Sequence, residues 1–307
     1  MNHGVNLTLG DGFDTRFAED LALVAEHGLH DVRLPIDWAA LQPRAGGWDG
    51  KRADWYRHVF DAADEAGVRV WAALFDRTAQ LPGWFQDERG LVDDRATGRF
   101  WPRWVDAVTD AFGDRVAGWF PFDDPVGRAD EASAGDSLRH QETIVNLLRA
   151  WRDAWRILRG GPPVATSLAC FGPKVTDDWW ATTWLYGMGD GVIAVPGRME
   201  RELDDFQGAC DIIGLRLAVD GTTPRWEAAI GDAFQRAAEV LPDHPLAIAQ
   251  LAVKGPDADE QGVLFEAASS VIDDAGRNGI DMGLAFTPFG HLFTIDRDPR
   301  PTVTAWH

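Results

Sequence analysis

The fold is decided by the stretch VRVWAALF, which runs from Val68 to Phe75 and is apolar at almost every position. Strands that read this way are usually covered on both faces, as in parallel sheets flanked by helices. An amphipathic stretch precedes it and ends at Gly67, and a glycine just past a helix commonly closes that helix in a left-handed conformation. A second nearly apolar run, DIIGLRLA, spans Asp211 to Ala218. These stretches predict helix-strand units of a parallel sheet.

The same alternation occurs eight times along the 307 residues. The predicted strands are His3 to Leu7, Asp31 to Ile36, Val68 to Leu74, Val116 to Phe122, Pro163 to Ala169, Asp211 to Leu217, Pro245 to Leu251 and Asp281 to Thr287. The predicted helices between them include Phe17 to His27, Trp55 to Ala66, Trp101 to Phe112, Asp136 to Leu158, Pro224 to Val240 and Glu260 to Arg277. Eight such units predict an α/β protein with one (β/α)₈ TIM barrel over residues 1–307. An open doubly wound sheet is the alternative, but no glycine-rich turn follows the first strand.

The charge balance excludes several kinds of partner. The chain has 29 Lys and Arg against 49 Asp and Glu, a net charge of −20, which disfavours nucleic acid and anionic membrane surfaces. Cys170 and Cys210 fit no metal or redox spacing, so we expect reduced, buried thiols. There is no basic leader before an apolar run and no apolar stretch of about 18 residues. We therefore expect a cytoplasmic protein whose partner is a small molecule or another protein.

The chemistry of a barrel collects at the carboxyl ends of its strands. Reading those ends gives mainly carboxylates and guanidiniums, namely Arg33, Asp37, Asp76, Arg77, Asp123, Asp124 and Arg216, together with Gln250 and His291. Trp180 follows the fifth strand on a segment long enough to form a lid. Its ring could stack on an apolar or sugar face, with core packing or a protein contact as the alternative. No group of histidines has metal-ligand spacing, so we expect neither a metal nor another cofactor.

Several of these stretches resemble family 1 glycoside hydrolases, the β-glucosidase-like retaining enzymes built on (β/α)₈ barrels. The similar segments are FAEDLALVAEHGLHDVRLPIDWAALQP (Phe17 to Pro43), AGVRVWAALFDRTAQLPGWF (Ala66 to Phe85), FGDRVAGWFPFDDPVG (Phe112 to Gly127), HPLAIAQLAVKG (His244 to Gly255) and GLAFTPFGHLFTIDRD (Gly283 to Asp298). Their order and spacing agree with the family nearly throughout the chain, which is shorter than typical members. The resemblance implies a barrel with a sugar-type site at its mouth.

The resemblance also implies two catalytic positions, and both have changed. In that family two glutamates about 5 Å apart divide the work of proton donor and nucleophile. The proton-donor position falls on Asp124, whose carboxyl is withdrawn by one methylene. The nucleophile position falls on Gln250, and a neutral amide cannot attack an anomeric carbon. Because neighbouring residues of a strand point to opposite faces, we expect Asp124 rather than Asp123 to reach the cleft.

The family's sugar-binding positions have changed as well. Arg33 persists, but Asp76-Arg77 stands where the family has His-Trp, and Arg216 stands where it has Asn. The added guanidiniums suit bidentate capture of a carboxylate or phosphate, which points to an anionic or partly anionic, glycosidic small molecule. In the alternative interpretation, these arginines pair internally with Asp37, Asp76, Asp123 and Asp124.

Three functions stay open at this point. One is an enzyme for a glycosidic or related substrate, with Asp124 as acid or base and without a glutamate nucleophile. Another is a catalytically silent barrel that binds a ligand or a protein. The third is an enzyme repurposed for non-hydrolytic biosynthetic chemistry, since a fold does not determine its function.

Overall fold

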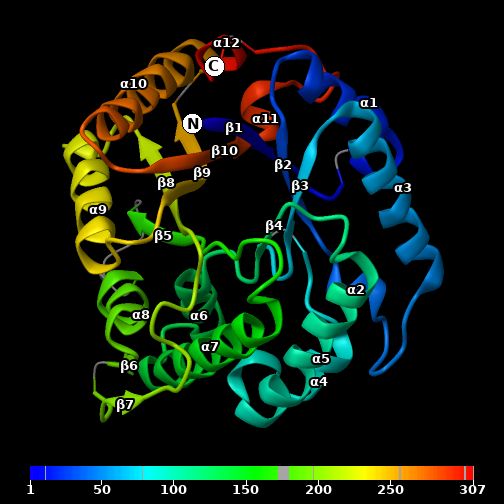
Figure 1. Cartoon of the computed structure of the whole chain (residues 1–307), viewed down its shortest axis with the longest axis vertical. Coiled ribbons are helices and arrows are strands. Elements are labelled where there is room, and N and C mark those ends of the chain that lie inside the picture. Colours follow the sequence, from blue (N-terminus) through cyan, green and yellow to red (C-terminus); the bar gives the residue numbers. More distant parts are fainter. Residues whose placement is uncertain are drawn as a thin grey trace.

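The computed structural model describes residues 1–10, 12–77, 79–171, 180–195, 197–255, 257–300 and 302–306. Eight parallel strands lie side by side in the order β4-β3-β2-β1-β10-β9-β8-β5. They are β1 (Asn2–Asn6), β2 (Asp31–Pro35), β3 (Arg69–Ala73), β4 (Gly118–Phe120), β5 (Leu168–Phe171), β8 (Ile213–Asp220), β9 (Leu246–Lys254) and β10 (Met282–Pro288). A parallel bridge between Trp119 and Val164 links β4 to the chain that leads into β5. The sheet thus curls into the predicted (β/α)₈ barrel, and each predicted strand overlaps an observed one (Figure 1).

The helices surround this sheet (Figure 1). They are α1 (Phe13–Glu26), α2 (Trp38–Leu41), α3 (Gly50–Ala66), α4 (Gly83–Asp87), α5 (Asp94–Phe112), α6 (Pro125–Ser133), α7 (Ser137–Leu158), α8 (Tyr186–Asp190), α9 (Trp226–Val240), α10 (Ala258–Arg277), α11 (Phe289–Leu292) and α12 (Thr302–Ala305). A 3₁₀ turn, Gly90–Val92, and a π-helical turn, Trp180–Leu185, complete the helical elements of the described residues. A short antiparallel pair, β6 (Val192–Ile193) and β7 (Arg201–Glu202), lies outside the barrel sheet.

Glycines close the helices where the sequence predicted. Gly28, Gly67 and Gly279 have φ values of 70°, 69° and 94°, in the left-handed region that glycine enters without steric conflict. The backbone N–H of Gly67 donates to carbonyls of the last turn of α3, which satisfies acceptors that would otherwise face no donor. Each glycine thereby turns the chain from a helix into the next strand.

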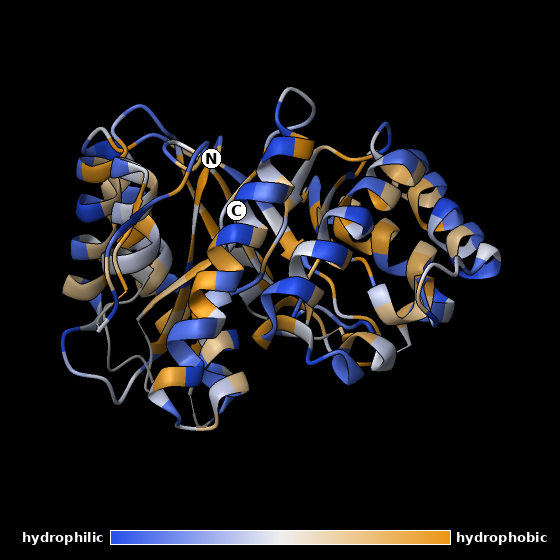
Figure 2. Ribbon diagram, turned by 90° about the horizontal axis from the view of Figure 1, so that it is seen from below, coloured by the Kyte–Doolittle hydropathy of each residue, from blue (hydrophilic) through white to orange (hydrophobic). Residues whose placement is uncertain are grey.

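The apolar core has two parts. One lies between the strands and the surrounding helices, and the other fills the barrel with Trp71, Phe120, Phe286 and small residues from the neighbouring strands. Gly118 is required here, because a Cβ at that position would lie 2.2 Å from the Trp71 ring. Figure 2 shows largely apolar strands lying between helices in which apolar and polar residues alternate. The interior is therefore packed, and chemistry can occur only at its ends.

The many tryptophans of the described chain serve mainly as core. Trp38 stacks on Trp104 with ring centroids 5.4 Å apart, and Trp101 stacks on Phe122 at 4.5 Å. The indole N–H of Trp151 donates to the carbonyl of Ala209, so this polar group is satisfied inside the core. Cys170 and Cys210 are both buried, and burial raises the pKa of Cys210. Among the described helices, none combines the length and apolarity needed to cross a membrane.

Candidate functional site

Five strands deliver polar side chains to the carboxyl end of the barrel. Arg33 lies in β2, Arg216 in β8 and Gln250 in β9, while Asp76 follows β3 and Asp123 follows β4. The parallel sheet places these positions at the same end of the barrel, although they are separated by up to 217 residues of sequence. This end is the one where barrel enzymes carry their sites.

Asp123 is the centre of a buried ion network. Its Oδ1 lies 2.7 Å from Nη2 of Arg33, and its Oδ2 accepts a 2.6 Å hydrogen bond from Nη1 of Arg216. The hydroxyl of Ser167 donates to Oδ1 at 2.7 Å, and Nη2 of Arg33 also contacts Asp76 at 3.2 Å. Arg33 is only 2% exposed and Asp123 only 3%, so both charges depend on each other rather than on water.

The network determines the charge state of its members. Burial on its own would raise the pKa of Asp123, but the guanidiniums of Arg33 and Arg216 outweigh it and hold that pKa well below its usual value. For Arg33, burial lowers the pKa, and the carboxylates of Asp123 and Asp76 more than reverse the effect. Asp123 is therefore a permanent anion at neutral pH and has no proton to donate.

Arg33 sits where the apolar interior meets the charged mouth. Its guanidinium lies 4.8 Å from the centre of the Phe120 ring, a favourable cation–π contact. On the other side, Nη1 of Arg33 donates to the carbonyl of Ala249 at 3.4 Å, and the Asn6 amide donates to the same oxygen at 3.1 Å. The register of β8 on β9 shifts at Ala249, which is skipped in the pairing. This irregularity lets a strand carbonyl face the site.

Asp124 has a different environment from Asp123. It adopts a left-handed conformation, with φ 49°, and caps α6 by accepting from the N–H of Gly127 at 3.1 Å. Its Oδ2 lies 2.5 Å from Nη1 of Arg77, whose other end pairs with Glu131. A Cβ at Gly127 would come within 2.2 Å of Oδ2, so only glycine leaves room for this carboxylate.

Whether Asp124 rather than Asp123 reaches the cleft stays a prediction, but the two side chains have different partners. Strand alternation does not apply to the pair, because β4 ends at Phe120 and Asp124 leaves the extended conformation. Asp123 points to the central cations, while Asp124, at the start of α6, points to Arg77.

Gln250 stands directly beside Arg216, since the two are register partners of β9 and β8. Its side chain is half-buried. An amide in this position brings donors and an acceptor to the mouth but no charge.

Arg128 belongs to the same cluster and was missed by the sequence reasoning. Its Nη2 donates to the backbone carbonyl of Asp76, and its guanidinium lies 4.5 Å from the centre of the Phe75 ring. Burial lowers the pKa of Arg128, although Glu131 opposes that shift. The available signal was its position in the first turn of α6, directly after the strand-end residues Asp123 and Asp124.

The other predicted residues lie apart from this cluster or cannot be placed. Asp37 caps α2 by accepting from the N–H of Ala40 at 3.0 Å and does not join the ion pairs. His291 lies in α11, where burial, followed by the charge of Arg300, lowers its pKa. Trp180 begins the π-helical turn, but its side chain lies outside the described part of the chain. Within that part, no three His, Cys, Asp or Glu residues are grouped as metal ligands.

The charged network makes a prediction about acid. Because the folded pKa of Asp123 is depressed, its contribution to stability is complete well above the unfolded pKa of about 3.9 and is lost as the pH falls below that value. Asp123→Asn lacks this titration. We expect the difference in unfolding free energy between wild type and this variant to shrink from pH 6 to pH 3, as measured by urea unfolding. A difference that stays constant would contradict the arrangement.

The sequence comparisons concern mainly the first half of the barrel. Residues 6–133 match the sequence model of Glycosyl hydrolase family 1. Beta-glucosidase 17 of Arabidopsis thaliana is 30% identical over 128 residues, which are 41% of this chain and 24% of the relative. The 6-phospho-beta-glucosidase GmuD of Bacillus subtilis (strain 168) is 30% identical over 115 residues, 37% of this chain and 24% of the relative. The matches thus span about a quarter of these curated relatives.

The structural comparisons cover nearly the whole chain. The beta-glycosidase from Pyrococcus horikoshii superposes with a TM-score of 0.80 at 16% identity, covering 96% of this chain and 84% of that one. The beta-glucosidase from Thermotoga maritima in complex with cyclophellitol gives 0.76 at 15% identity, covering 90% and 77%. Identities this low establish the fold alone. This chain therefore has the barrel fold of family 1 glycoside hydrolases and carries that family's sequence pattern over residues 6–133.

Proposed function

We propose that this protein binds a small, uncharged sugar or glycoside at the mouth of its barrel without cleaving it by the double-displacement route of family 1. The observation that carries the proposal is the position of Gln250, a neutral, half-buried amide at the edge of the buried network. A polar amide beside fixed charges can hydrogen-bond sugar hydroxyls. It cannot form a covalent bond to an anomeric carbon.

The environment of Asp124 supports the loss of hydrolysis. In glycoside cleavage the departing oxygen usually takes a proton from a carboxylic acid that is free to approach it. Both oxygens of Asp124 already have partners, since one accepts from Gly127 and the other pairs with Arg77. This carboxylate is arranged to accept hydrogen bonds rather than to deliver a proton.

The pairing of the arginines supports an uncharged ligand. Arg33 and Arg216 share Asp123, and Arg77 has two carboxylate partners. An anionic ligand would have to displace an internal carboxylate, which would leave that charge buried and unpaired. We therefore propose an uncharged ligand in place of the anionic substrate that the sequence suggested. The calorimetric comparison of a sugar with its phosphate tests both.

A second candidate is hydrolysis with Asp124 as general acid or base and a water held by Gln250. One observation favours it: the side chain of Arg77 is 34% exposed, so a substrate that draws Arg77 away would release Asp124. Such a reaction would proceed without a covalent glycosyl intermediate, and the amide of Gln250 would orient the water.

Calorimetry and an activity assay together separate these candidates. We expect methyl β-glucoside to bind and its 6-phosphate to bind more weakly. Gln250→Leu should lower the affinity for methyl β-glucoside by about tenfold, because one hydrogen bond is lost. The matched control is Gln235→Leu on the surface of α9, which should change nothing. Binding of neither sugar would overturn the proposal, and preference for the phosphate would restore the anionic ligand.

The same protein is then incubated with 4-nitrophenyl β-glucoside. We expect the wild type to release no more nitrophenol than Asp124→Ala does. Turnover that is present in wild type and lost in Asp124→Ala would establish the second candidate instead.

A further inference from the structure

A separate cavity of about 220 Å³ lies beside the barrel mouth, between the segments that follow β1 and β10 and the first turns of α1. The residues that line it are Leu7, Thr8, Gly10, Phe13, Asp20, Phe289, Gly290, Phe293, Thr294, Ile295, Arg297 and Arg300. None of them belongs to the Asp123 network. The cavity has the volume of roughly seven water molecules and could hold a compact organic molecule.

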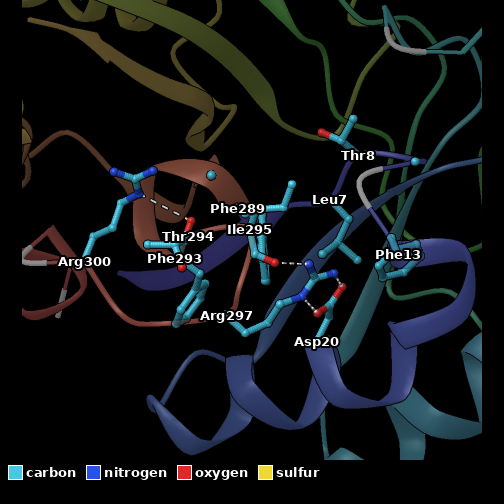
Figure 3. A pocket seen from close by; sticks show the side chains of 12 residues that line it. Leu7, Thr8, Phe13, Asp20, Phe289, Phe293, Thr294, Ile295, Arg297 and Arg300 are labelled. Atoms are coloured by element: carbon cyan, nitrogen blue, oxygen red, sulfur yellow. Dashed lines mark hydrogen bonds and ion pairs between the residues drawn. The ribbon is translucent and has the colours of Figure 1, made fainter.

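The middle of the cavity is apolar. Figure 3 shows Phe13 near one end and Arg300 near the other, with Phe289 and Ile295 between them. The rings of Phe289 and Phe293 lie 4.9 Å apart, so they form a continuous aromatic wall. Sites for small molecules typically combine such a lining with a few placed polar groups.

One charged pair in the wall is already complete. Arg297 binds Asp20 through two hydrogen bonds, from Nε at 2.6 Å and from Nη2 at 2.9 Å. Its Nη1 donates to the carbonyl of Ile295 at 2.7 Å. The charges of Arg297 and Asp20 neutralise each other. The pair therefore gives the cavity wall a polar surface without a net charge.

Arg300 differs from Arg297 in this respect. Its Nε donates to the carbonyl of Phe293 at 3.4 Å, which fixes the base of the guanidinium. Its two terminal nitrogens have no partner among the described residues, and its side chain is half-buried. Its positive charge also contributes to lowering the pKa of the neighbouring His291, after the larger effect of burial. A half-buried guanidinium with two unused donor groups suits a carboxylate.

We propose that this cavity binds a small organic acid, with its carboxylate on the terminal nitrogens of Arg300 and its apolar body against Phe289, Phe293 and Ile295. The Arg297–Asp20 pair forms the wall on the α1 side. The site is independent of the sugar proposed at the mouth, and either could exist without the other.

The test compares an acid with its neutral isostere. We expect phenylacetate to bind by calorimetry at least tenfold more tightly than phenylacetamide, because only the acid can pair with Arg300. Arg300→Gln should abolish this difference, and the exposed control Arg277→Gln on α10 should keep it. Isocaproate is a third probe, in which a branched aliphatic chain replaces the ring of phenylacetate. If isocaproate binds as tightly as phenylacetate, the site accepts aliphatic as well as aromatic acids, which equally supports the proposal.

A second variant tests the location of the ligand without removing a charge. A Cβ at Gly290 meets no atom within 4 Å, so Gly290→Leu can fold while its side chain takes up cavity space, and we expect it to block both probes. Equal affinity for acid and amide in wild type, no binding of either, or unchanged binding in Arg300→Gln or Gly290→Leu would overturn the proposal. Methyl β-glucoside binding should be unchanged in both variants, which distinguishes this site from the mouth.

Discussion

Replacing Asp123 with asparagine is expected to lower the free energy of unfolding by about 3 to 5 kcal/mol, because it leaves two buried guanidiniums without their main counter-charge. Arg33 is 2% exposed and would keep Asp76, at 3.2 Å, as its carboxylate partner. Arg216 would lose the carboxylate partner to which it donates at 2.6 Å. The melting temperature should fall by roughly 10 °C, as measured by circular dichroism or calorimetry.

The matched control makes the same chemical change at an exposed ion pair. Asp54 pairs with Arg57 on the surface of α3, with side chains 66% and 49% exposed. Exposed pairs contribute little, so Asp54→Asn should leave the melting temperature nearly unchanged. Equal effects of the two substitutions would mean that the Asp123 network does not hold the barrel mouth together.

Replacing Gln250 with glutamate is expected to create hydrolysis of 4-nitrophenyl β-glucoside on the order of 10²-fold above the wild type, because it supplies an anion where oxocarbenium charge develops. Nitrophenol is a good leaving group and needs little help from a proton donor. Asp124 can therefore remain unchanged in this variant. Release of nitrophenol at saturating substrate is the measurement, and a burst of product would indicate a covalent intermediate.

Gln250→Leu is the control, since it removes the amide without adding charge. Combining Gln250→Glu with Asp124→Glu should extend activity to poorer leaving groups. The longer glutamate side chain can reach beyond the ion pair with Arg77 and donate a proton to the leaving group. If neither glutamate variant cleaves the activated substrate while both stay folded, the mouth does not hold a sugar in a reactive position, and the proposed ligand class is wrong.

Much of the barrel could be predicted because its signals are local. Each strand appears as a short apolar run, and glycines such as Gly67 mark the ends of helices by their conformational freedom. The boundaries were less accurate: α3 begins at Gly50, five residues before the predicted start, because Asp49 caps it. β4 has only three paired residues, since its later part turns away toward α6.

The candidate site was predictable in composition but not in pairing. Arg33, Asp76, Asp123 and Arg216 could be assigned to one end of the barrel, because all of them lie at or near the carboxyl ends of predicted strands. The sequence could not say that Arg33 and Arg216 share one carboxylate. That arrangement depends on where β2, β4 and β8 come to lie around the barrel.

By itself the sequence determined where the strands lie along the chain and that helices connect them as parallel strands. It also determined that a glutamine stands where the family resemblance implies a nucleophile. These are properties of single residues or of neighbours along the chain. Only the tertiary structure decided that Asp123 neutralises two cations, that Asp124 caps a helix, and that Arg300 borders a cavity. The physical reason is that charges act over a few ångströms in space, and the closed barrel brings together groups that the chain keeps far apart.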